Sequence, residues 1–344
     1  MLYELPGFEH VDARDVKEVV SLLRQHGRKA KVIAGATDLL GLMKDRVEGP
    51  ECNIPEVLVN IKKIPDMMGI AYDKTAGLRI GAGVTLNRLA ASGVIQKEFK
   101  ILSQAALQVG TTQLRNMGTL GGNLCQRPRC LYFRHRHFLC FKKGGNRCYA
   151  MTGEHRFYHA IFKQGRCVMA HPSDLAPALI ALKAEVRVMG LQGSKNVPLQ
   201  EFSLGPAHYT ETVLDSDECL TEIHVPIQTA GTHQVFLKER IRHSADFALS
   251  SVAAVGRPSE GVWGDIRIVL GGVAPFPYVA LTAEDEIRGK KLDVGLISLA
   301  AEASVREAKP LPMNGYKVDL TKTLVKRALA SLALSASRDE AASQ

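Results

Sequence analysis

Five of the seven cysteines of this chain lie within 43 consecutive residues, from Cys125 to Cys167. The intervals between them are 4, 9, 7 and 18 residues, so no two form a C-x-x-C pair. Structural zinc sites and redox dithiols commonly use that pair, so both are disfavoured. A disulfide framework is also disfavoured, because the chain is long, its cysteine number is odd and its first residues lack a secretory pattern. The clustering predicts a metal or iron-sulfur site or, alternatively, unligated structural thiols. The isolated Cys52 and Cys219 are expected to be ordinary core residues.

The same segment carries the net positive charge of the chain. Between Leu124 and Ala170 there are ten Lys or Arg residues and one acid, Glu154, an excess that equals the formal charge of +9 for the whole chain. Nearby cations stabilise thiolates, the form of cysteine that binds metal. Aromatic residues are interleaved with these charges, so stacking on single-stranded nucleic acid is a competing interpretation. The basic residues are Arg127, Arg129, Arg134, Arg136, Lys142, Lys143, Arg147, Arg156, Lys163 and Arg166.

Length and motifs exclude several other classes of protein. At 344 residues, 46% of them hydrophobic, the chain can build two or three units with their own cores. No apolar run approaches the roughly 20 residues that span a bilayer, so membrane insertion is not expected. Gly81-x-Gly83 lacks the third glycine of a dinucleotide fingerprint, and no P-loop, nucleophile elbow or EF-hand is visible. His155 and His159 do not fit the zincin pattern, because Glu154 precedes the first histidine, and they are interpreted as surface or cluster-shell histidines.

Helix and strand patterns indicate a mixed α and β architecture. Apolar residues repeat at helical spacing from Val16 to Leu23, after Asp12, which is placed to cap that helix. Strands are predicted at 31–34, 57–61 and 78–83, and two helical stretches lie between 86 and 109. Further along, a helix is predicted at 175–182, strands at 233–237, 248–255 and 266–270, and long helices at 294–309 and 318–334. Residues 336–344 are expected to be a loose tail.

Two glycine-rich runs stand out within this pattern. The strand at 31–34 leads into Gly35-Ala36-Thr37-Asp38, and the run at 116–123 immediately precedes the cysteines. Such runs let backbone N–H groups approach a phosphate or another bulky ligand, although tight turns for packing use the same residues. After the cysteines, Ser173 or Asp174 is placed to cap the helix that follows, a role compatible with ligand binding.

Four segments, in order along nearly the whole chain, carry a resemblance to a known family. They are Val32-Ile33-Ala34-Gly35-Ala36-Thr37-Asp38, Gly118-Thr119-Leu120-Gly121-Gly122-Asn123, Pro172-Ser173-Asp174-Leu175-Ala176-Pro177-Ala178-Leu179 and Phe247-Ala248-Leu249-Ser250-Ser251-Val252. Together they resemble the FAD-binding medium subunit of molybdenum hydroxylases, the xanthine dehydrogenase family. The resemblance implies an α/β FAD-binding domain of the vanillyl-alcohol oxidase type at 1–228, with subdomains of about 1–60 and 61–228. It also implies an α+β flavoprotein C-terminal domain at 229–335.

The resemblance also implies an FAD site, residue by residue. The first FAD loop, residues 31–39, and the second FAD loop, residues 118–123, are expected to surround the pyrophosphate, and the FAD is expected to be held noncovalently. Ser173 and Asp174 are expected near the ribityl and flavin end, and Lys238 beside the isoalloxazine. The implied residues are Lys31, Val32, Ile33, Ala34, Gly35, Ala36, Thr37, Asp38, Leu39, Gly118, Thr119, Gly122, Asn123, Ser173, Asp174 and Lys238.

Residues 124–169, which we call the insert, resemble a segment that only part of this family carries. It is present in the β subunit of 4-hydroxybenzoyl-CoA reductase and in the flavin subunit of periplasmic aldehyde oxidoreductases, where four cysteines hold a 4Fe-4S cluster. The resemblance implies Cys130, Cys140, Cys148 and Cys167 as the cluster ligands. Cys125 is set aside because it falls at the end of the second FAD loop. The alternative that remains open is that Cys125 replaces one of the four as a ligand.

The function implied is that of an oxidoreductase subunit with no catalytic residue of its own. A large subunit with the molybdenum cofactor would bind substrate, a small subunit would carry two 2Fe-2S clusters, and this chain would relay electrons to ferredoxin or another carrier. The Arg-x-Arg-Cys-x-Tyr-Phe-Arg run is more similar to the aldehyde enzymes, which favours oxidation of an aldehyde or N-heterocycle. The alternative direction is reductive, as in 4-hydroxybenzoyl-CoA reductase.

Two alternatives from other classes are also considered. One is a nucleic-acid-binding module with a structural metal on four cysteines, which would be colourless and would bind oligonucleotides in a salt-dependent way. The other, a self-contained flavin oxidase, is disfavoured because no substrate-binding cap domain is apparent. The expected compartment is the cytoplasm, with co-export of the folded chain to the periplasm beside a signal-bearing partner as the alternative.

Overall fold

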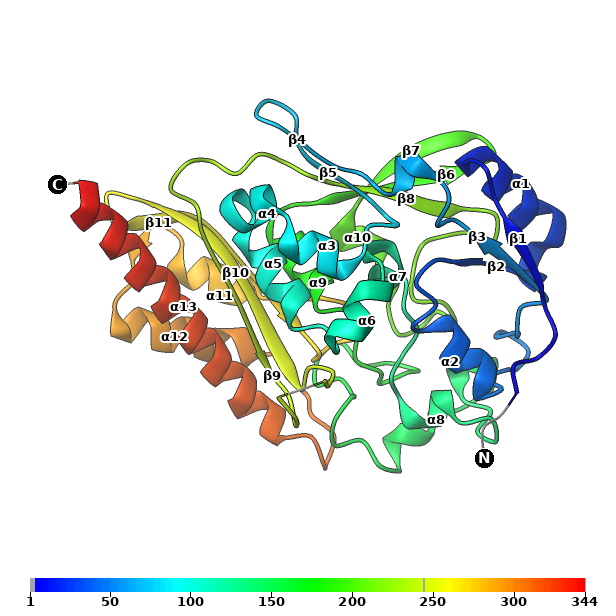
Figure 1. The fold of residues 1–344 in the computed structure, drawn as a ribbon. Helices are drawn as coiled ribbons and strands as arrows, with labels where there is room; N and C mark the ends of the chain where they lie inside the picture. Colours follow the sequence, from blue (N-terminus) through cyan, green and yellow to red (C-terminus); the bar gives the residue numbers. More distant parts are fainter. Residues whose placement is uncertain (1–3, 244, 344) are drawn as a thin grey trace.

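A computed structural model describes residues 4–243 and 245–343 of the chain, and within them three β-sheets are joined by helices (Figure 1). The first sheet is parallel, in the order β1 (Glu9–Asp12), β3 (Val57–Asn60) and β2 (Ala30–Ile33). Helix α1 (Val16–His26) packs on it, and its Val19 and Leu23 join the core that contains Val57 and Val59 of β3. Its cap is Asp15, whose Oδ1 accepts from the Glu18 N–H at 2.8 Å, so the prediction of Asp12 as the cap was wrong. Asp12 is the last residue of β1.

The second sheet is antiparallel and lies beside a group of short helices. Its order is β4 (Ile70–Asp73), β5 (Gly77–Gly81), β8 (Cys219–Val225), β6 (Glu185–Gly190) and β7 (Gly193–Pro198). Where two helical stretches were predicted between residues 86 and 109, three helices form. The helices of this part are α2 (Leu39–Lys44), α3 (Leu86–Ala91), α4 (Gly93–Glu98), α5 (Lys100–Leu107), α6 (Thr112–Met117), α7 (Leu120–Leu124), α9 (Leu175–Ala181) and α10 (Leu199–Phe202).

The third sheet is covered on both faces. Strands β12 (Tyr278–Val279), β11 (Val262–Gly271), β10 (Ser250–Ser259) and β9 (His233–Glu239) are antiparallel neighbours in that order, and β13 (Lys290–Lys291) also pairs with β11. Side chains along β10 alternate between two cores, as the two-residue period of a strand requires. Val252 and Ala254 join the core formed with α11 (Leu281–Ile287), α12 (Val294–Val305) and α13 (Tyr316–Ser343), whereas Ala253 and Val255 join the core that contains α5 and α9 (Figure 1). The α+β arrangement predicted for this part is confirmed.

The end of the chain differs from the prediction. Residues 336–344 were expected to be a loose tail, but α13 runs to Ser343, and residue 344 lies outside the described residues. Ala336 is buried against the third sheet, and Ser335 Oγ lies 3.0 Å from His233 Nδ1 of β9. The helix is therefore held to the sheet beyond Leu334, where its apolar pattern weakens.

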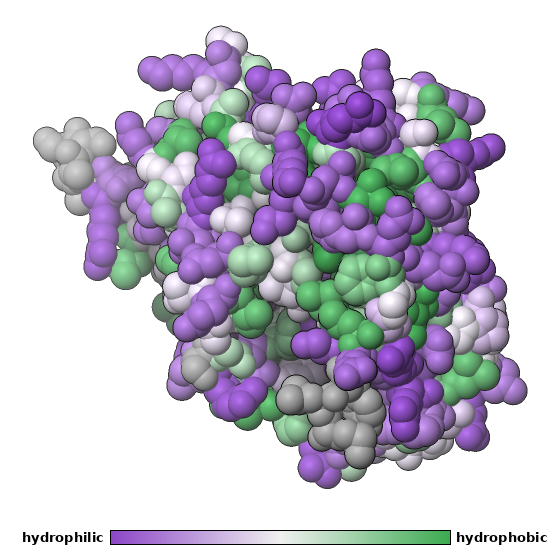
Figure 2. All heavy atoms as spheres, turned by 45° about the vertical axis from the view of Figure 1, so that its right-hand side comes forward, coloured by the Kyte–Doolittle hydropathy of each residue, from purple (hydrophilic) through white to green (hydrophobic). Residues whose placement is uncertain are grey.

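The insert is largely irregular and lies between the first sheet and the C-terminal part. It contains α8 (Leu131–Arg134) and single turns at Phe141–Lys143 and Tyr149–Met151. Ile161 and Phe162 donate to Val273 O, and Lys309 donates to Ile161 O, so the end of the insert is attached to the C-terminal part. On the face drawn in Figure 2, hydrophobic side chains form patches separated by hydrophilic ones. Within the described residues, none of the helices has the length and apolar character needed to span a bilayer.

Candidate functional site

The two loops expected to bind FAD lie against each other. After β2 the chain turns at Gly35, and a Cβ atom at this position would lie 2.0 Å from the backbone oxygen of Met117. A Cβ on Gly118 would lie 3.4 Å from Thr37 Oγ1 and 3.0 Å from Leu114 O. Real Cβ atoms do not approach backbone atoms to 2.0 Å, so only glycine fits at position 35. The next residue, Ala36, has a φ of 60°, a left-handed conformation that non-glycine residues rarely adopt.

The remaining residues of both FAD loops occupy the starts and ends of short elements. Lys31, Val32 and Ile33 belong to β2, Ala34 precedes the turn, and Leu39 begins α2. In the second FAD loop, Thr119 Oγ1 accepts from the Gly122 N–H at 3.2 Å and so caps α7, and Asn123 is buried within that helix. The structure thus brings together the two glycine-rich segments, which are 79 or more residues apart in the sequence.

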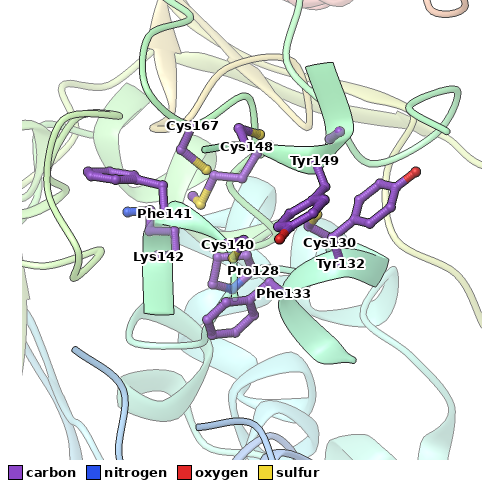
Figure 3. A pocket seen from close by; sticks show the side chains of 12 residues that line it. Pro128, Cys130, Tyr132, Phe133, Cys140, Phe141, Lys142, Cys148, Tyr149 and Cys167 are labelled. Carbon is purple, nitrogen blue, oxygen red and sulfur yellow. The ribbon is translucent and has the colours of Figure 1, made fainter. Parts of the chain in front are cut away.

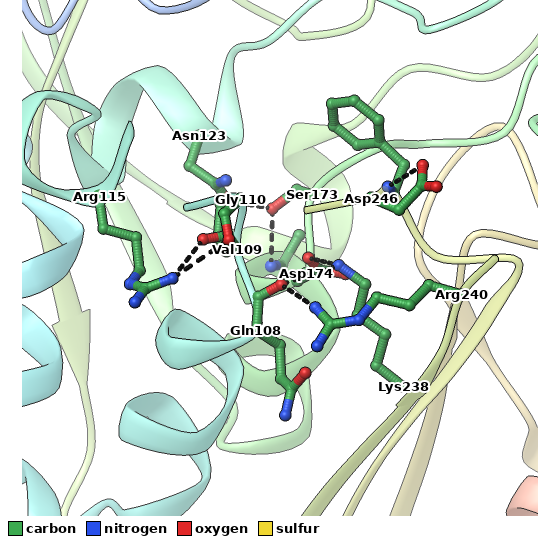
Figure 4. Close-up of polar contacts among 12 residues, drawn as sticks. Gln108, Val109, Gly110, Arg115, Asn123, Ser173, Asp174, Lys238, Arg240 and Asp246 are labelled. Carbon is green, nitrogen blue, oxygen red and sulfur yellow. Dashed lines mark hydrogen bonds and ion pairs between the residues drawn. The ribbon is translucent and has the colours of Figure 1, made fainter. Parts of the chain in front are cut away.

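A buried polar group extends from the second FAD loop to β9 (Figure 4). Ser173 Oγ donates to Asn123 Oδ1 at 2.6 Å and accepts from the Ala176 N–H at 3.0 Å, so Ser173 caps α9. Asp174 makes no capping bond and instead accepts from Lys238 Nζ at 2.6 Å. The two side chains are only 5% and 1% exposed. Burial raises the pKa of the Asp174 carboxyl, while the Lys238 charge and hydrogen bond act to lower it.

Sequence reasoning missed two members of this polar group. The backbone oxygen of Gln108 accepts from Lys238 Nζ at 3.0 Å and from Arg240 Nη1 at 3.1 Å (Figure 4). Arg240 follows Lys238 by two residues and lies just beyond the end of β9, and both side chains donate to the same oxygen. That spacing was the available signal for Arg240, whereas a backbone acceptor such as Gln108 O leaves none in the residue types.

Asp38 joins the first FAD loop to the insert. Its Oδ2 accepts from the Arg127 N–H at 2.8 Å, and its Oδ1 pairs with Arg129 Nη2 at 2.8 Å and Arg134 Nη2 at 2.5 Å. Arg134 Nε also donates to Pro128 O at 2.8 Å. The side chains of Asp38, Arg129 and Arg134 are 16–19% exposed. The sequence suggested a backbone role for Asp38, and the structure adds this role for its carboxylate.

Four cysteines line one small cavity, which we call the sulfur cavity (Figure 3). They are Cys130, Cys140, Cys148 and Cys167, the same four that the resemblance implies. The cavity has a volume of about 10 Å³, room for about one water molecule. Cys125 is not among the lining residues and packs against the core shared by α5 and α9. Cys52 packs beside the sulfur cavity in a satellite core, and Cys219 is buried in β8.

Backbone N–H groups surround these four sulfurs. Those of Tyr132 and Phe133 act to lower the pKa of Cys130, those of Lys142 and Lys143 that of Cys140, those of Ala150, Met151 and Val168 that of Cys148, and that of Met169 the pKa of Cys167. Hydrogen bonds of this kind stabilise thiolate over thiol. Burial raises the pKa of Cys125 and Cys219 to about 12, as it does for Cys130, but among the described residues no backbone donor opposes the rise at Cys125 or Cys219.

The pKa values of the four thiols in the sulfur cavity are shifted in different directions. Burial raises the pKa of Cys130 to about 12, and burial also raises that of Cys140. Cys148 accepts a hydrogen bond from the Cys167 thiol, which lowers the pKa of Cys148 to about 6 and raises that of Cys167. The two side chains lie next to each other in Figure 3.

Cations and histidines form a second layer around the sulfur cavity. Lys142 and Lys143 are 2% and 0% exposed, and their charges act to lower the pKa of Cys167 and Cys140, respectively, against burial. Lys142 Nζ pairs with Glu211 Oε1 at 3.2 Å, and Arg127 Nε pairs with Glu211 Oε2 at 2.7 Å.

His159 is the histidine that reaches a sulfur. Its Nε2 lies 3.3 Å from Cys130 Sγ, and burial lowers its pKa to about 4, so the ring is neutral. His155 is also buried, with Nδ1 2.8 Å from Ala150 O and Nε2 accepting from the Met313 N–H at 3.0 Å. Both histidines therefore belong to the shell of the sulfur cavity.

The donor set of the sulfur cavity consists of four cysteine thiols. Over residues 4–243 and 245–343, no three His, Cys, Asp or Glu side chains come close enough to ligate one metal ion. A 4Fe-4S cluster instead takes four thiolates, one for each iron of a cube. The sulfur cavity has four cysteines, the number that such a cluster takes, but its volume of about 10 Å³ has room for about one water molecule rather than for a cluster.

A second cavity is lined by Asp174 and by residues that are sequence neighbours of those lining the sulfur cavity. Arg129 and His171 line the second cavity. Cys130, next to Arg129, and Met169, two residues before His171, line the sulfur cavity. His171 Nε2 is buried without a hydrogen-bond partner among the described residues, and burial lowers the His171 pKa to about 4. The expected flavin end of the FAD site and the sulfur cavity therefore share the same two stretches of chain as walls.

Comparisons with known proteins cover almost the whole chain. Residues 6–228 match the family described as the FAD-binding domain in molybdopterin dehydrogenase, and residues 236–332 match the CO dehydrogenase flavoprotein C-terminal domain. The chain is 34% identical to the aldehyde oxidoreductase FAD-binding subunit PaoB of Escherichia coli K12 over 312 residues, covering 88% of this chain and 90% of that subunit. It is 30% identical to the carbon monoxide dehydrogenase medium chain of Hydrogenophaga pseudoflava, with 94% and 96% covered. The structure of the carbon monoxide dehydrogenase of H. pseudoflava superposes with a TM-score of 0.77 at 29% identity, covering 97% of this chain and 99% of that chain.

Proposed function

Since this chain belongs to the family of FAD-binding medium subunits of molybdenum hydroxylases, the xanthine dehydrogenase and CO dehydrogenase family, we propose that it relays electrons through FAD and a 4Fe-4S cluster. Membership of the family establishes the fold class and the FAD-binding domain. The cluster, its ligands, the residues that hold FAD and the relay are the proposal.

The sulfur cavity carries the proposal. Backbone N–H groups act to lower the pKa of each of the four cysteines on this cavity, whereas within the described residues none opposes the effect of burial on Cys125 or Cys219. A core thiol needs no N–H donor, but a thiolate in a low-dielectric site does. Lys142 and Lys143 add buried positive charge beside the anionic centre that four thiolates would create. Cys130, Cys140, Cys148 and Cys167 are therefore the proposed ligands.

For FAD, the proposed site comprises both FAD loops, Ser173, Asp174 and Lys238. The contact of Gly35 with Met117 brings the loops together, and Asp174, which is paired with the buried Lys238, provides a carboxylate at the second cavity. When bound, FAD supplies a group that accepts electrons in pairs and releases them singly, and the cluster supplies a one-electron centre. The protein residues hold both groups, exclude water from between them and set the local charge.

The proposed partners follow from the family. A large subunit with the molybdenum cofactor would bind substrate, a small subunit with two 2Fe-2S clusters would adjoin the FAD, and ferredoxin or another carrier would exchange electrons with the 4Fe-4S cluster. The chain itself would contribute no catalytic residue. Its 34% identity to an aldehyde oxidoreductase FAD-binding subunit favours the oxidative direction, with reduction of a 4-hydroxybenzoyl-CoA type of substrate as the alternative.

The nucleic-acid hypothesis is disfavoured by how the basic residues of the insert are used. Arg129 and Arg134 are paired with Asp38, and Arg127 and Lys142 are paired with Glu211. Lys143 is fully buried. Phosphate contacts need cations on the surface, and these five are occupied inside the protein.

A low-temperature EPR spectrum of the anaerobically purified, dithionite-reduced chain tests the proposal, together with iron, sulfide and FAD content. We expect a reduced 4Fe-4S signal with about four irons per chain, lost or altered in Cys148→Ser and retained in Cys125→Ser. The two variants remove the same atom from a cavity-lining and from a core cysteine. Protein that contains FAD but no iron after anaerobic reconstitution would leave a plain flavin subunit and overturn the cluster assignment.

A further inference from the structure

The Asp38 carboxylate is the point at which the first FAD loop meets the insert. Both of its oxygens are used, by donors that all come from residues 127–134. That segment also contains Cys130, one of the proposed cluster ligands. A single carboxylate of the FAD loop thus fixes the part of the insert that presents a sulfur to the cluster.

The contact stabilises both sides. Without Asp38, the guanidinium groups of Arg129 and Arg134, which both pair with its Oδ1 and are 19% and 16% exposed, would be left close together without a carboxylate between them. Without the arginines, the first FAD loop would lose its anchor next to Ala36, whose left-handed conformation persists only where the surroundings hold it. Neither segment is expected to keep its conformation alone.

The same segment also reaches the flavin end of the site. The Arg129 guanidinium lies 4.5 Å from the centre of the Phe247 ring and lines the second cavity, which Asp174 also lines. Its neighbour Cys130 lines the sulfur cavity. A shift of residues 127–134 would therefore change both cavities at once.

We infer that Asp38 is a positioning residue that couples the two cofactor sites, so that FAD in its loops favours the insert conformation that binds the cluster, and the reverse. The inference rests on the proposed function for the cluster. Because coupling between two sites is reciprocal, each cofactor must raise the affinity for the other by the same factor. A typical factor is roughly 5- to 150-fold.

The test uses the full-length chain with two variants that break the contact from opposite sides, Asp38→Asn and Arg134→Gln. Asp45→Asn, an exposed aspartate at the end of α2, is the matched control. Flavin fluorescence gives the FAD Kd of the metal-free chain and of the chain reconstituted with ferrous iron and sulfide. We expect cluster loading to lower the FAD Kd at least fivefold in the wild type and in Asp45→Asn. In Asp38→Asn and Arg134→Gln, cluster loading should leave the FAD Kd almost unchanged.

Hydrogen exchange separates this inference from the cluster assignment. In the metal-free chain, added FAD should slow amide exchange in residues 127–134 of the wild type and of Asp45→Asn, but not in Asp38→Asn or Arg134→Gln. Equal protection by FAD in all four proteins would overturn the coupling. A wild type that takes up no iron would overturn the cluster assignment instead, and the exchange data would still decide whether Asp38 couples FAD binding to the insert.

Discussion

The Lys238 ammonium on β9 lies 2.6 Å from the Asp174 carboxylate at the start of α9, and both side chains are almost completely buried. The pair joins the third sheet to the helices of the FAD-binding part. Burial alone raises the pKa of Asp174, and Lys238 keeps the carboxylate from being an unpaired charge in the interior.

Replacing Lys238 with Met should lower the free energy of unfolding by about 3–5 kcal/mol at neutral pH, because it leaves a buried charge without a partner. The deficit should depend on pH. The folded-state pKa of Asp174 is above the 3.8 of an unperturbed aspartate, and without Lys238 it rises further. The loss is therefore largest above that pKa and shrinks as the pH falls and Asp174 becomes neutral. Urea unfolding between pH 4 and pH 8 measures this loss of stability.

The control is the same substitution at Lys29, which is exposed in its pair with Glu56 and should change the free energy of unfolding by less than about 1 kcal/mol. Equal losses at the two positions would contradict the prediction.

Gly35→Ala should separate the two FAD loops, because the new Cβ would overlap the backbone oxygen of Met117. We expect a destabilisation of about 1–3 kcal/mol and a clear loss of FAD from the purified protein, read from the flavin absorbance per chain. Gly41→Ala in α2 is the control, since its Cβ would meet only Arg134 Nη1 at 3.8 Å. The free energy of unfolding of Gly41→Ala should rise by about 0.5–1 kcal/mol, because alanine makes the unfolded chain less flexible than glycine does. Full FAD content in Gly35→Ala would show that the loops can separate without losing the cofactor.

His159→Leu should lower the midpoint potential of the proposed cluster while leaving iron bound. The lost contact is the one between His159 Nε2 and Cys130 Sγ at 3.3 Å, and hydrogen bonds to ligand sulfurs are among the factors that set cluster potentials. A net hydrogen bond of about 0.5–1.5 kcal/mol corresponds to about 20–65 mV for a one-electron centre. EPR-monitored redox titration gives the shift, with the exposed His137→Leu as control. An unchanged potential in His159→Leu would mean that this contact does not reach the cluster.

Lys317 should make the stability of the chain rise with pH. It is fully buried at the start of α13 and donates to the backbone oxygens of Phe157, His159 and Gly272 at 2.7–3.0 Å. Burial lowers its pKa from 10.5 to about 7. Between these values the unfolded chain binds one more proton than the folded chain, so the free energy of unfolding increases by up to about 1.4 kcal/mol per pH unit. Below pH 7 both states are charged and the contribution is constant.

The check on Lys317 is urea unfolding at several pH values from 7 to 9.5 for the wild type and Lys317→Met. The variant should be less stable at pH 9 and should lack this part of the slope. Lys322→Met, whose lysine pairs with Glu302 and Asp319 near the surface, should keep the wild-type slope. Identical slopes in the wild type and Lys317→Met would contradict the predicted shift.

The sequence predicted the regular elements well where apolar residues have a strict period. The strand predicted at 57–61 is β3 (Val57–Asn60), and the helix predicted at 175–182 is α9 (Leu175–Ala181). Errors occurred at ends, where side-chain bonds decide. Asp15 rather than Asp12 caps α1, because its carboxylate reaches the Glu18 N–H.

The candidate site was predictable in its members more than in its connections. The family resemblance singled out the four cysteines, which line one cavity, and the two loops, which lie against each other, whereas the convergence of three arginines on Asp38 was not predicted. That contact joins residues at least 89 positions apart, and charge patterns within the insert do not reveal which acid they meet. The N–H donors to sulfur were also beyond sequence reasoning, because they depend on the path of an irregular backbone rather than on residue type.

The attachment of the insert to the C-terminal part bears on protein engineering. Lys309 N–H, Met313 N–H and Lys317 Nζ each bond to a residue between 155 and 161. These three supporting residues lie far along the chain from the five clustered cysteines. A transplant of residues 124–169 into a related flavoprotein would arrive without these supports. The insert and residues 309–317 must therefore be moved together. The recipient must also supply the partners that Asp38, Glu211 and Val273 provide here if it is to gain a sulfur cavity of the same shape.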